Sequence, residues 1–243
     1  MTCELVALCV DANDPAVLAE FWAAVLGREV EDDGSGEAVL PPDGEPGFTI
    51  RFAPTSEPKV GPNQMHFDLA STTSQDQAAT VTRALERGAS HLDVGQLPQE
   101  EHVVLADPEG NEFCVIEAGN GFLAGTPRIG CLSSDGSPRV GHFWSEALGW
   151  PLVWDQDEET AIQSARGGSK ISWGGPPYTP RSGTQRWRWH LAPPPGGDQQ
   201  AEVERLLGLG ASRLASGRRA DGAVVLADPD GNEFRVLPAG TAG

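Results

Sequence analysis

The sequence has few lysines and no long apolar run, and each shortage excludes a class of protein. Only two of its 243 residues are lysine, and 17 basic residues stand against 35 acidic ones, for a net charge of −18. Such an acidic chain is a poor ligand for nucleic acid, so we expect no nucleic-acid partner. No uncharged apolar stretch approaches the roughly 18 residues that a membrane-spanning helix needs, and the first residues lack the basic segment of a signal peptide. We therefore expect no membrane partner and a cytoplasmic location.

Cysteine is also scarce, and its spacing excludes the usual zinc motifs. The four cysteines form no Cys-x-x-Cys pair. Free thiols fit a reducing compartment better than a disulfide scaffold does. With 39% hydrophobic residues, the chain has enough apolar surface for one large domain or two of about 120 residues. We predict a globular protein that needs neither a disulfide nor a metal to fold.

Charge and tryptophan are divided unequally along the chain. Residues 1–121 hold 22 acidic and five basic residues, whereas residues 122–243 hold 13 and 12. Six of the seven tryptophans lie in the second, nearly neutral half. The acidic half either keeps one surface solvated or creates a field that attracts a cationic ligand.

The sequence repeats itself, which indicates a duplicated domain. Residues 103–115 match residues 224–236 at 11 of 13 positions, and His66 corresponds to His190. The predicted parts are a first domain over residues 1–118, a Gly-rich linker over residues 119–125 and a second domain over residues 126–243.

Each half is expected to contain two βαβββ modules. Residues 5–10 form a short apolar run that is typical of a buried strand. Asp14 and Pro15 then provide an N-cap and a first-turn proline, and Gly27 ends the helix in a left-handed conformation. Strands follow this helix, and the same order begins again near residue 65.

An Asp-Pro-x-Gly-Asn motif closes each half, at residues 107–111 and 228–232. Proline fixes the first position of a turn and glycine supplies a positive φ, so the motif predicts a tight hairpin. We interpret the motif as structural, and expect ligand-contacting groups on the strand that follows it.

Together, the paired modules, the Phe-Trp helix, the His-x-Asp strand and the terminal hairpin resemble the vicinal oxygen chelate superfamily, above all its glyoxalase-like and bleomycin-resistance-like members. The resemblance covers residues 4–118 and about 126–238. It implies an α+β fold of tandem duplicated domains, whose modules form curved mixed sheets around a cavity. It does not decide the function, because this fold supports metal-dependent enzymes as well as proteins that only bind a drug.

In metal-using members of the superfamily, His and Glu or Gln side chains from the first and last strands of the modules hold the ion. The resemblance places these positions of the first half at Glu4, Arg51, His66 and Cys114. We count only Glu4 and His66 as natural ligands, because the Arg51 guanidinium repels a dication and Cys114 stands where the resemblance places a carboxylate ligand. Glu112, on the same strand face as Cys114, could complete a set of Glu4, His66 and Glu112.

The second half has fewer ligands still. Its corresponding positions are Thr126, Ser172 or Trp173, His190 and Arg235. We therefore expect no cofactor, with a divalent metal possible only in the first domain.

Other side chains are candidates for catalysis. His66 and His190 are either structural imidazoles, oriented by Glu112 or Glu233, or groups that transfer protons. Cys114 is either a nucleophile or an inert thiol, and acids nearby favour the inert form.

The tryptophans near His190 form a separate candidate group. Trp187 and Trp189 alternate on the strand that leads into His190, and one face of that strand should meet the cavity. With Trp173, they form either ordinary core or an aromatic box for a planar or cationic ligand.

Two functions compete on these grounds. The first is a metal-independent binding protein that sequesters an aromatic or cationic small molecule in a sheet-lined cavity. Its candidate ligand-binding residues are Glu4, Arg51, Cys114, Trp173, Trp187, Trp189, Glu233 and Arg235. The second is a lyase, isomerase or dioxygenase that acts on vicinal oxygens through a metal or through the acid/base groups His66, His190 and Glu112.

The missing metal ligands favour binding. A third interpretation makes one half a structural support for the other. Because a duplicated chain can imitate a dimer of single domains, the sequence is compatible with a monomer or a homodimer.

Overall fold

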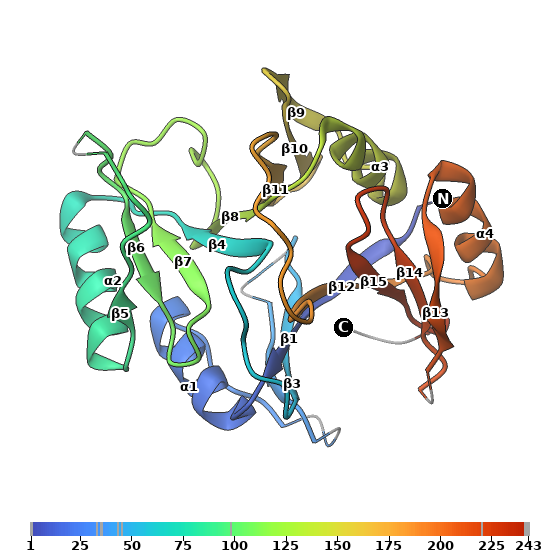
Figure 1. The fold of residues 1–243 in the computed structure, drawn as a ribbon, viewed down its shortest axis with the longest axis horizontal. Helices are drawn as coiled ribbons and strands as arrows, with labels where there is room; N and C mark the ends of the chain where they lie inside the picture. The colour runs from blue at the N-terminus through green and yellow to red at the C-terminus, as the bar shows by residue number, and fades with distance from the viewer. Residues whose placement is uncertain are drawn as a thin grey trace.

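The computed structural model describes residues 2–32, 34, 36–42, 44, 46–97, 99–219 and 221–240, which form four modules in chain order (Figure 1). The first half contains β1 (Glu4–Ala12), α1 (Pro15–Leu26), β2 (Ala38–Leu40), β3 (Thr49–Pro54), β4 (Met65–Leu69), α2 (Ser74–Glu86), β5 (Ser90–His91), β6 (Val103–Ala106) and β7 (Glu112–Val115). The second half contains β8 (Ile129–Ser134), α3 (Pro138–Leu148), β9 (Leu152–Gln156), β10 (Glu159–Ser164), β11 (Gly167–Trp173), β12 (Trp187–Ala192), α4 (Gln199–Leu209), β13 (Ser212–Arg218), β14 (Val224–Ala227) and β15 (Glu233–Val236). None of the helices in these ranges is long and apolar enough to cross a bilayer.

The predicted βαβββ order is present in all four modules, with one reduced strand. In the first module, the strand after α1 is represented by a single bridge between Glu31 and Val39. The predicted ends of α1 are confirmed, since Asp14 accepts a hydrogen bond from the Val17 backbone (3.1 Å) and Gly27 has a φ of 71°.

The strands form two mixed sheets, and each sheet takes one module from each half of the chain. The seven-stranded sheet has the order β13-β14-β15-β12-β1-β3-β2, and the eight-stranded sheet has the order β5-β6-β7-β4-β8-β11-β10-β9. Antiparallel pairing of β1 with β12 joins the first and fourth modules, and antiparallel pairing of β4 with β8 joins the second and third. Both sheets are therefore completed within a single chain.

The two helices of each half nevertheless pack together, within one hydrophobic core that both halves share. Figure 1 shows α1 and α2 together on one side of the molecule and α3 and α4 together on the other. Within each half, a buried hydrogen bond ties the first helix to the last hairpin: Trp22 Nε1 donates to Asp107 Oδ2 (3.1 Å), and Trp144 Nε1 donates to Asp228 Oδ2 (3.2 Å). The duplicated Phe-Trp and Asp-Pro-x-Gly-Asn motifs are thus two ends of one contact, which confirms the structural interpretation of the hairpins.

Helix α3 approaches β10 closely at Gly141. A Cβ atom added there would lie 2.6 Å from the Cβ of Thr160, a side chain that is 1% exposed. We expect Gly141→Ala to lower the free energy of unfolding by about 1–3 kcal/mol, because the overpacked helix must move away from the sheet. Urea denaturation measures this loss.

Gly208 in α4 provides the matched control. An added Cβ there meets no heavy atom within 4 Å. Gly208→Ala should therefore raise the free energy of unfolding by about 0.5–1 kcal/mol through better helix propensity. Effects of the same sign and size at both glycines would contradict the close approach at Gly141.

Candidate functional site

One face of the eight-stranded sheet carries a row of side chains that line a pocket. Registered neighbours on adjacent strands share a face of a sheet. The pairing places His66 beside Ser133, Ser133 beside Ser172, and Ser172 beside Ala161. Ala161 in turn pairs with Trp154 on β9. All five residues line a pocket of about 390 Å³.

The rest of the pocket wall is aromatic and acidic. Trp154 is 39% exposed, and Phe122 enters from the segment that joins the two halves. Lys170 fixes that segment, because its Nζ lies 4.4 Å from the centre of the Phe122 ring and donates to the Phe122 carbonyl. Asp135 and Glu159 add two carboxyl groups to the lining. The pocket therefore combines π surfaces with negative charge.

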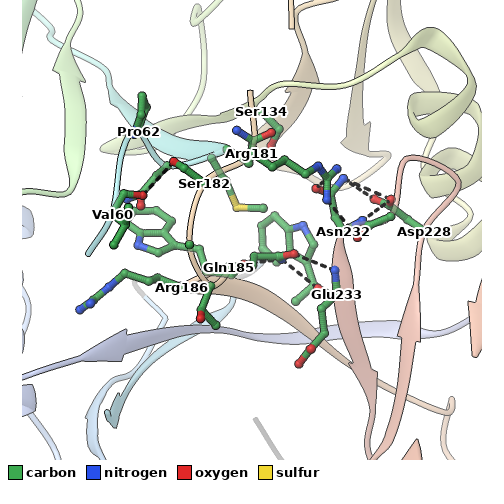
Figure 2. Close-up of a pocket in the computed structure, with 18 of the residues that line it drawn as sticks. Val60, Pro62, Ser134, Arg181, Ser182, Gln185, Arg186, Asp228, Asn232 and Glu233 are labelled. Atoms are coloured by element: carbon green, nitrogen blue, oxygen red, sulfur yellow. Dashed lines mark hydrogen bonds between the residues drawn. The ribbon is translucent and has the colours of Figure 1, made fainter. Parts of the chain in front are cut away.

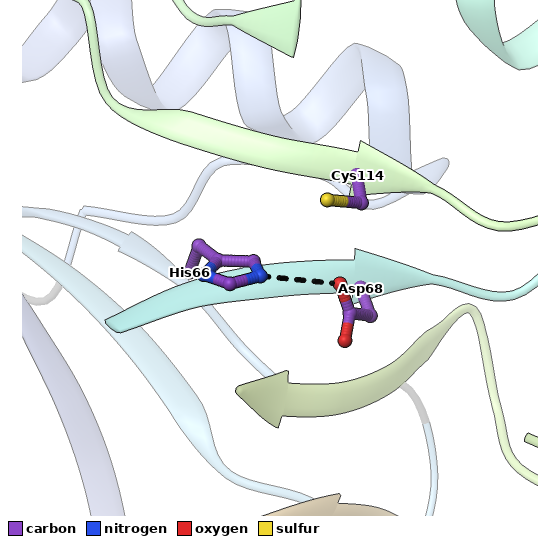
Figure 3. Close-up of side chains that lie close together, drawn as sticks. All are labelled: His66, Asp68 and Cys114. Atoms are coloured by element: carbon purple, nitrogen blue, oxygen red, sulfur yellow. Dashed lines mark ion pairs between the residues drawn. The ribbon is translucent and has the colours of Figure 1, made fainter. Parts of the chain in front are cut away.

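His66 forms an ion pair with Asp68, two residues further along β4 and on the same face (Figure 3). His66 Nε2 lies 3.4 Å from Asp68 Oδ1, and Ser133 Oγ donates to the other carboxylate oxygen. Burial favours the neutral imidazole, but hydrogen bonding to Asp68 and Cys114 outweighs burial and raises the pKa of His66 to about 10. At neutral pH the ring is an imidazolium, which donates hydrogen bonds and does not accept a proton.

Cys114 on the neighbouring strand β7 completes a cluster with this pair. Within the described part of the chain, His66, Asp68 and Cys114 are the group whose nitrogen, oxygen and sulfur atoms gather as a metal site would need, all within 4.8 Å of one another. This donor set suits a first-row transition metal. Burial raises the pKa of the Cys114 thiol, and the His66 nitrogen already faces Asp68. The residues can hold a metal only by losing two protons, so its affinity would depend steeply on pH.

The other predicted metal ligands lie elsewhere. Glu4 begins β1 in the seven-stranded sheet and lines a separate pocket. Glu112 is engaged by Lys59, whose Nζ lies 2.9 Å from Oε1, and by the Asn63 backbone, whose N lies 3.2 Å from Oε2. The structure therefore does not gather Glu4, His66 and Glu112 into one group.

The predicted site did not include Asp68, whose carboxylate contacts His66. His66 and Asp68 are two residues apart on one strand. Because every second residue of a strand points to the same face, the sequence alone places Asp68 on the face of His66. Ser133, by contrast, could be placed beside His66 only once β8 was known to pair with β4.

A comparison with models of known protein families identifies the domain that each half of the chain contains. Residues 7–116 and 131–237 each match the model of the glyoxalase-like domain. The chain belongs to the glyoxalase-like domain family. The match confirms the predicted α+β fold with tandem duplicated domains. No curated protein matches the chain.

Solved structures share the fold over the whole length of this glyoxalase-like protein. Glyoxalase I from Zea mays is 14% identical, with 98% of this chain and 92% of that chain covered and a TM-score of 0.66. A Bacillus subtilis protein proposed to be a dioxygenase is 16% identical, with 99% and 86% covered and a TM-score of 0.62. At such low identity these likenesses establish the fold alone.

The tryptophans of β12 point away from His190. Trp187 and Trp189 are 2% and 4% exposed and occupy the opposite face of their strand. Trp187 packs on Phe67 with ring centres 4.7 Å apart, and Trp189 packs on Phe48 at 5.9 Å. In this glyoxalase-like protein both side chains are part of the hydrophobic core.

With Trp173, these tryptophans also border a smaller pocket of about 250 Å³ lined by residues of both sheets (Figure 2). Some of its polar groups are paired with one another, whereas Trp187 Nε1 and Ser134 Oγ are buried with no hydrogen-bond partner among the described residues. Gln185 bonds the backbone of Glu233 (2.7 and 3.0 Å), and Asn232 bonds Asp228 (2.9 Å). The bonds of Gln185 tie the segment before β12 to β15, and that of Asn232 lies within the β14–β15 hairpin. Trp173 lines both this pocket and the one on the His66 face.

His190 repeats the position of His66 in the seven-stranded sheet, with different neighbours. Register places it beside Ala7 and Arg235. Ala192 stands where the first half has Asp68, so the acidic partner is missing from the strand. Burial, followed by repulsion from Arg235 and other arginines, lowers the pKa of His190 to about 3. His66 and His190 thus belong to different sheets and carry opposite protonation states at neutral pH.

Proposed function

We propose that this glyoxalase-like protein binds and sequesters a planar aromatic small molecule with positive charge, in the pocket on the His66 face. The observation that carries the proposal is the lining of that pocket, in which Trp154 and Phe122 lie with Asp135 and Glu159. A volume of about 390 Å³ suits a small organic ligand. Aromatic faces stack on planar rings and attract cations, and the carboxylates add a complementary charge.

His66 adds a second requirement, a hydrogen-bond acceptor on the ligand. Its imidazolium is held by Asp68 and is a hydrogen-bond donor in the pocket. A ligand with an oxygen acceptor at one end and positive charge at the other would match both His66 and the acidic wall. The ion pair with Asp68 is neutral as a unit, so it does not repel the cation.

Replacement of the exposed tryptophan tests the proposal. We expect saturable binding of the planar cation proflavine, measured by fluorescence polarisation, and an affinity about fivefold or more lower in Trp154→Ala, because stacking and cation–π attraction are lost. The matched control is Val153→Ala, since Val153 is 44% exposed next to Trp154 on β9 and does not line the pocket.

Charge is tested with an uncharged tricyclic probe, acridone. Glu159→Gln should weaken proflavine binding more than acridone binding. Equal affinities of the Trp154→Ala and wild-type proteins for proflavine, or an absence of saturable binding, would sink the proposal.

A second function is supported by the cluster of His66, Asp68 and Cys114: an enzyme that acts on a substrate with vicinal oxygens with the help of a divalent metal. Such an ion would polarise a substrate oxygen as a Lewis acid. Native mass spectrometry of the purified protein, compared with its denatured mass, separates the two functions. A stoichiometric divalent ion that is retained by the wild type and lost in Cys114→Ser would favour the enzyme, whereas the sequestering function requires no such ion.

A further inference from the structure

The face of the seven-stranded sheet that carries His190 gathers arginines, although the protein has a net charge of −18. Register places Arg235 beside His190, Arg188 beside Cys9, and Cys9 beside Arg51. Because registered neighbours share a face, three guanidinium side chains project from the same side of the adjacent strands β15, β12, β1 and β3. This arginine face is independent of the pocket of the proposed function, which lies on the other sheet.

Two of the three arginines have a carboxylate partner that they do not share with another arginine of this face. Arg188 Nη1 donates to Asp11 Oδ1 (2.7 Å), and Arg188 Nη2 donates to the second oxygen of the same carboxylate. Arg51 Nε lies 3.5 Å from Glu37 Oε2. These ion pairs give Arg188 and Arg51 a structural role in the folded protein.

Arg235 is different, because it is buried without comparable partners. It is 9% exposed, and its Nε is buried with no hydrogen-bond partner among the described residues. The carboxylate paired with it, Glu233, lies 3.7 Å from its Nε and is shared with Arg188 Nε at 3.5 Å. Buried polar groups are normally hydrogen-bonded, and a guanidinium offers five donors.

Neighbouring arginines also disfavour the charged form of Arg235. Burial, followed by repulsion from Arg188 and Arg219, lowers the pKa of Arg235. Glu233 is the carboxylate nearest to Arg235, and it is shared with Arg188, so the ion pairing of Arg235 is weaker than that of Arg188 with Asp11 or of Arg51 with Glu37.

His190, which lies beside Arg235, supplies a second buried polar group without a hydrogen-bond partner in the described part of the chain. Its side chain is 7% exposed, and its Nε2 is buried with no partner among the described residues. The ring is neutral at physiological pH, so Nε2 can carry the proton and donate it in a hydrogen bond. Two adjacent strands therefore present two buried nitrogens, Arg235 Nε and His190 Nε2, that have no hydrogen-bond partner within the ranges that the structure describes.

We propose that Arg235 and His190 form a binding site for an oxyanion, the carboxylate or phosphate group of a small organic molecule. The planar fork of Arg235 matches two oxygens of such a group, and His190 Nε2–H can donate to one of them. Because the net charge of the protein repels anions in general, binding here requires this local cluster.

The experiment follows the ring resonances of His190 by NMR in the full chain while inorganic phosphate or malonate is added. The signal is assigned with His190→Gln. We expect a saturable shift and a rise in the pKa of His190, because a bound anion stabilises the imidazolium. Arg235→Gln should weaken the affinity about tenfold or more, as expected for loss of charge-assisted hydrogen bonds.

The matched control is Arg213→Gln, because Arg213 is a surface arginine paired with Glu204 at 2.9 Å. Its affinity should stay within about twofold of the wild type. Tighter binding of phosphate or of malonate identifies the preferred oxyanion, and either result supports the site. An absence of a saturable His190 shift with both probes, or equal weakening by Arg235→Gln and Arg213→Gln, overturns it.

Arg235→Gln removes a repelled buried charge, so its thermal midpoint should not fall below that of the wild type. If that variant fails to fold, Arg235→Lys replaces it in the same titration. Lysine keeps the charge and lacks the planar fork, so we expect a loss of several-fold in affinity, whereas wild-type affinity in Arg235→Lys would contradict the site.

Discussion

Asp107→Ala is expected to lower the free energy of unfolding by about 3–5 kcal/mol, because it leaves several buried donors unpaired. Asp107 is 3% exposed and accepts hydrogen bonds from Trp22 Nε1 (3.1 Å) and from the backbone N of Glu109 and of Asn111 (both 2.9 Å). The substitution also cuts the link between α1 and the β6–β7 hairpin. Urea denaturation, followed by tryptophan fluorescence, measures the loss.

Two other aspartates calibrate this result. Asp228→Ala removes the equivalent contact with Trp144 in the second half and should cost a similar amount. Asp198→Ala removes only an exposed N-cap bond to Ala201 (2.8 Å), which is worth about 1 kcal/mol. A loss in Asp107→Ala no larger than the loss in Asp198→Ala would refute the role of the buried contact.

Asp68→Asn is expected to lower the pKa of His66 from about 10 to below the ordinary histidine value of about 6.5. Burial already favours the neutral ring, and the hydrogen bond and charge of Asp68 oppose it. Without the carboxylate, burial prevails. NMR titration of the His66 ring, assigned with His66→Gln, measures the change.

The same shift predicts how stability depends on pH. The folded-state pKa of His66 lies above the unfolded value, so its stabilising contribution is fully present below about pH 6.5 and is lost as the pH rises toward 10. Asp68→Asn should remove this slope. Ser133→Ala, which leaves the ion pair of His66 and Asp68 in place, should shift the pKa much less. A His66 that titrates in Asp68→Asn as it does in the wild type would contradict the assignment.

Local rules account for the parts of the fold that the sequence predicts. Asp14, Pro15 and Gly27 determine where α1 begins and ends through capping and a left-handed glycine, and these effects act within a few residues. The duplicated motifs predict four modules because each motif repeats. Which modules share a sheet depends instead on the pairing of β1 with β12 and of β4 with β8, and no local pattern specifies those distant contacts.

The site was harder to predict for the same reason. Glu112 suits a metal ligand by its type and strand face, but Lys59, 53 residues earlier, engages its carboxylate. On β12, alternation separates the tryptophans from Arg188 and His190 without showing which face meets the core. Only the packing of the opposite face against Phe67 and Phe48 decides it.

Duplication has placed two corresponding histidines in opposite electrostatic surroundings. His66 has Asp68 and Cys114 as neighbours, whereas the corresponding positions beside His190 are Ala192 and Arg235. An acid favours the imidazolium and an arginine favours the neutral ring, so two substitutions reverse the protonation state. The two sites that we propose differ in ligand chemistry because of this reversal.

The most direct test of this account is an NMR titration of both histidines in the wild-type protein. The account predicts that His66 remains protonated through about pH 8, whereas His190 remains neutral down to about pH 4. Titration of both rings near about pH 6.5 would contradict it.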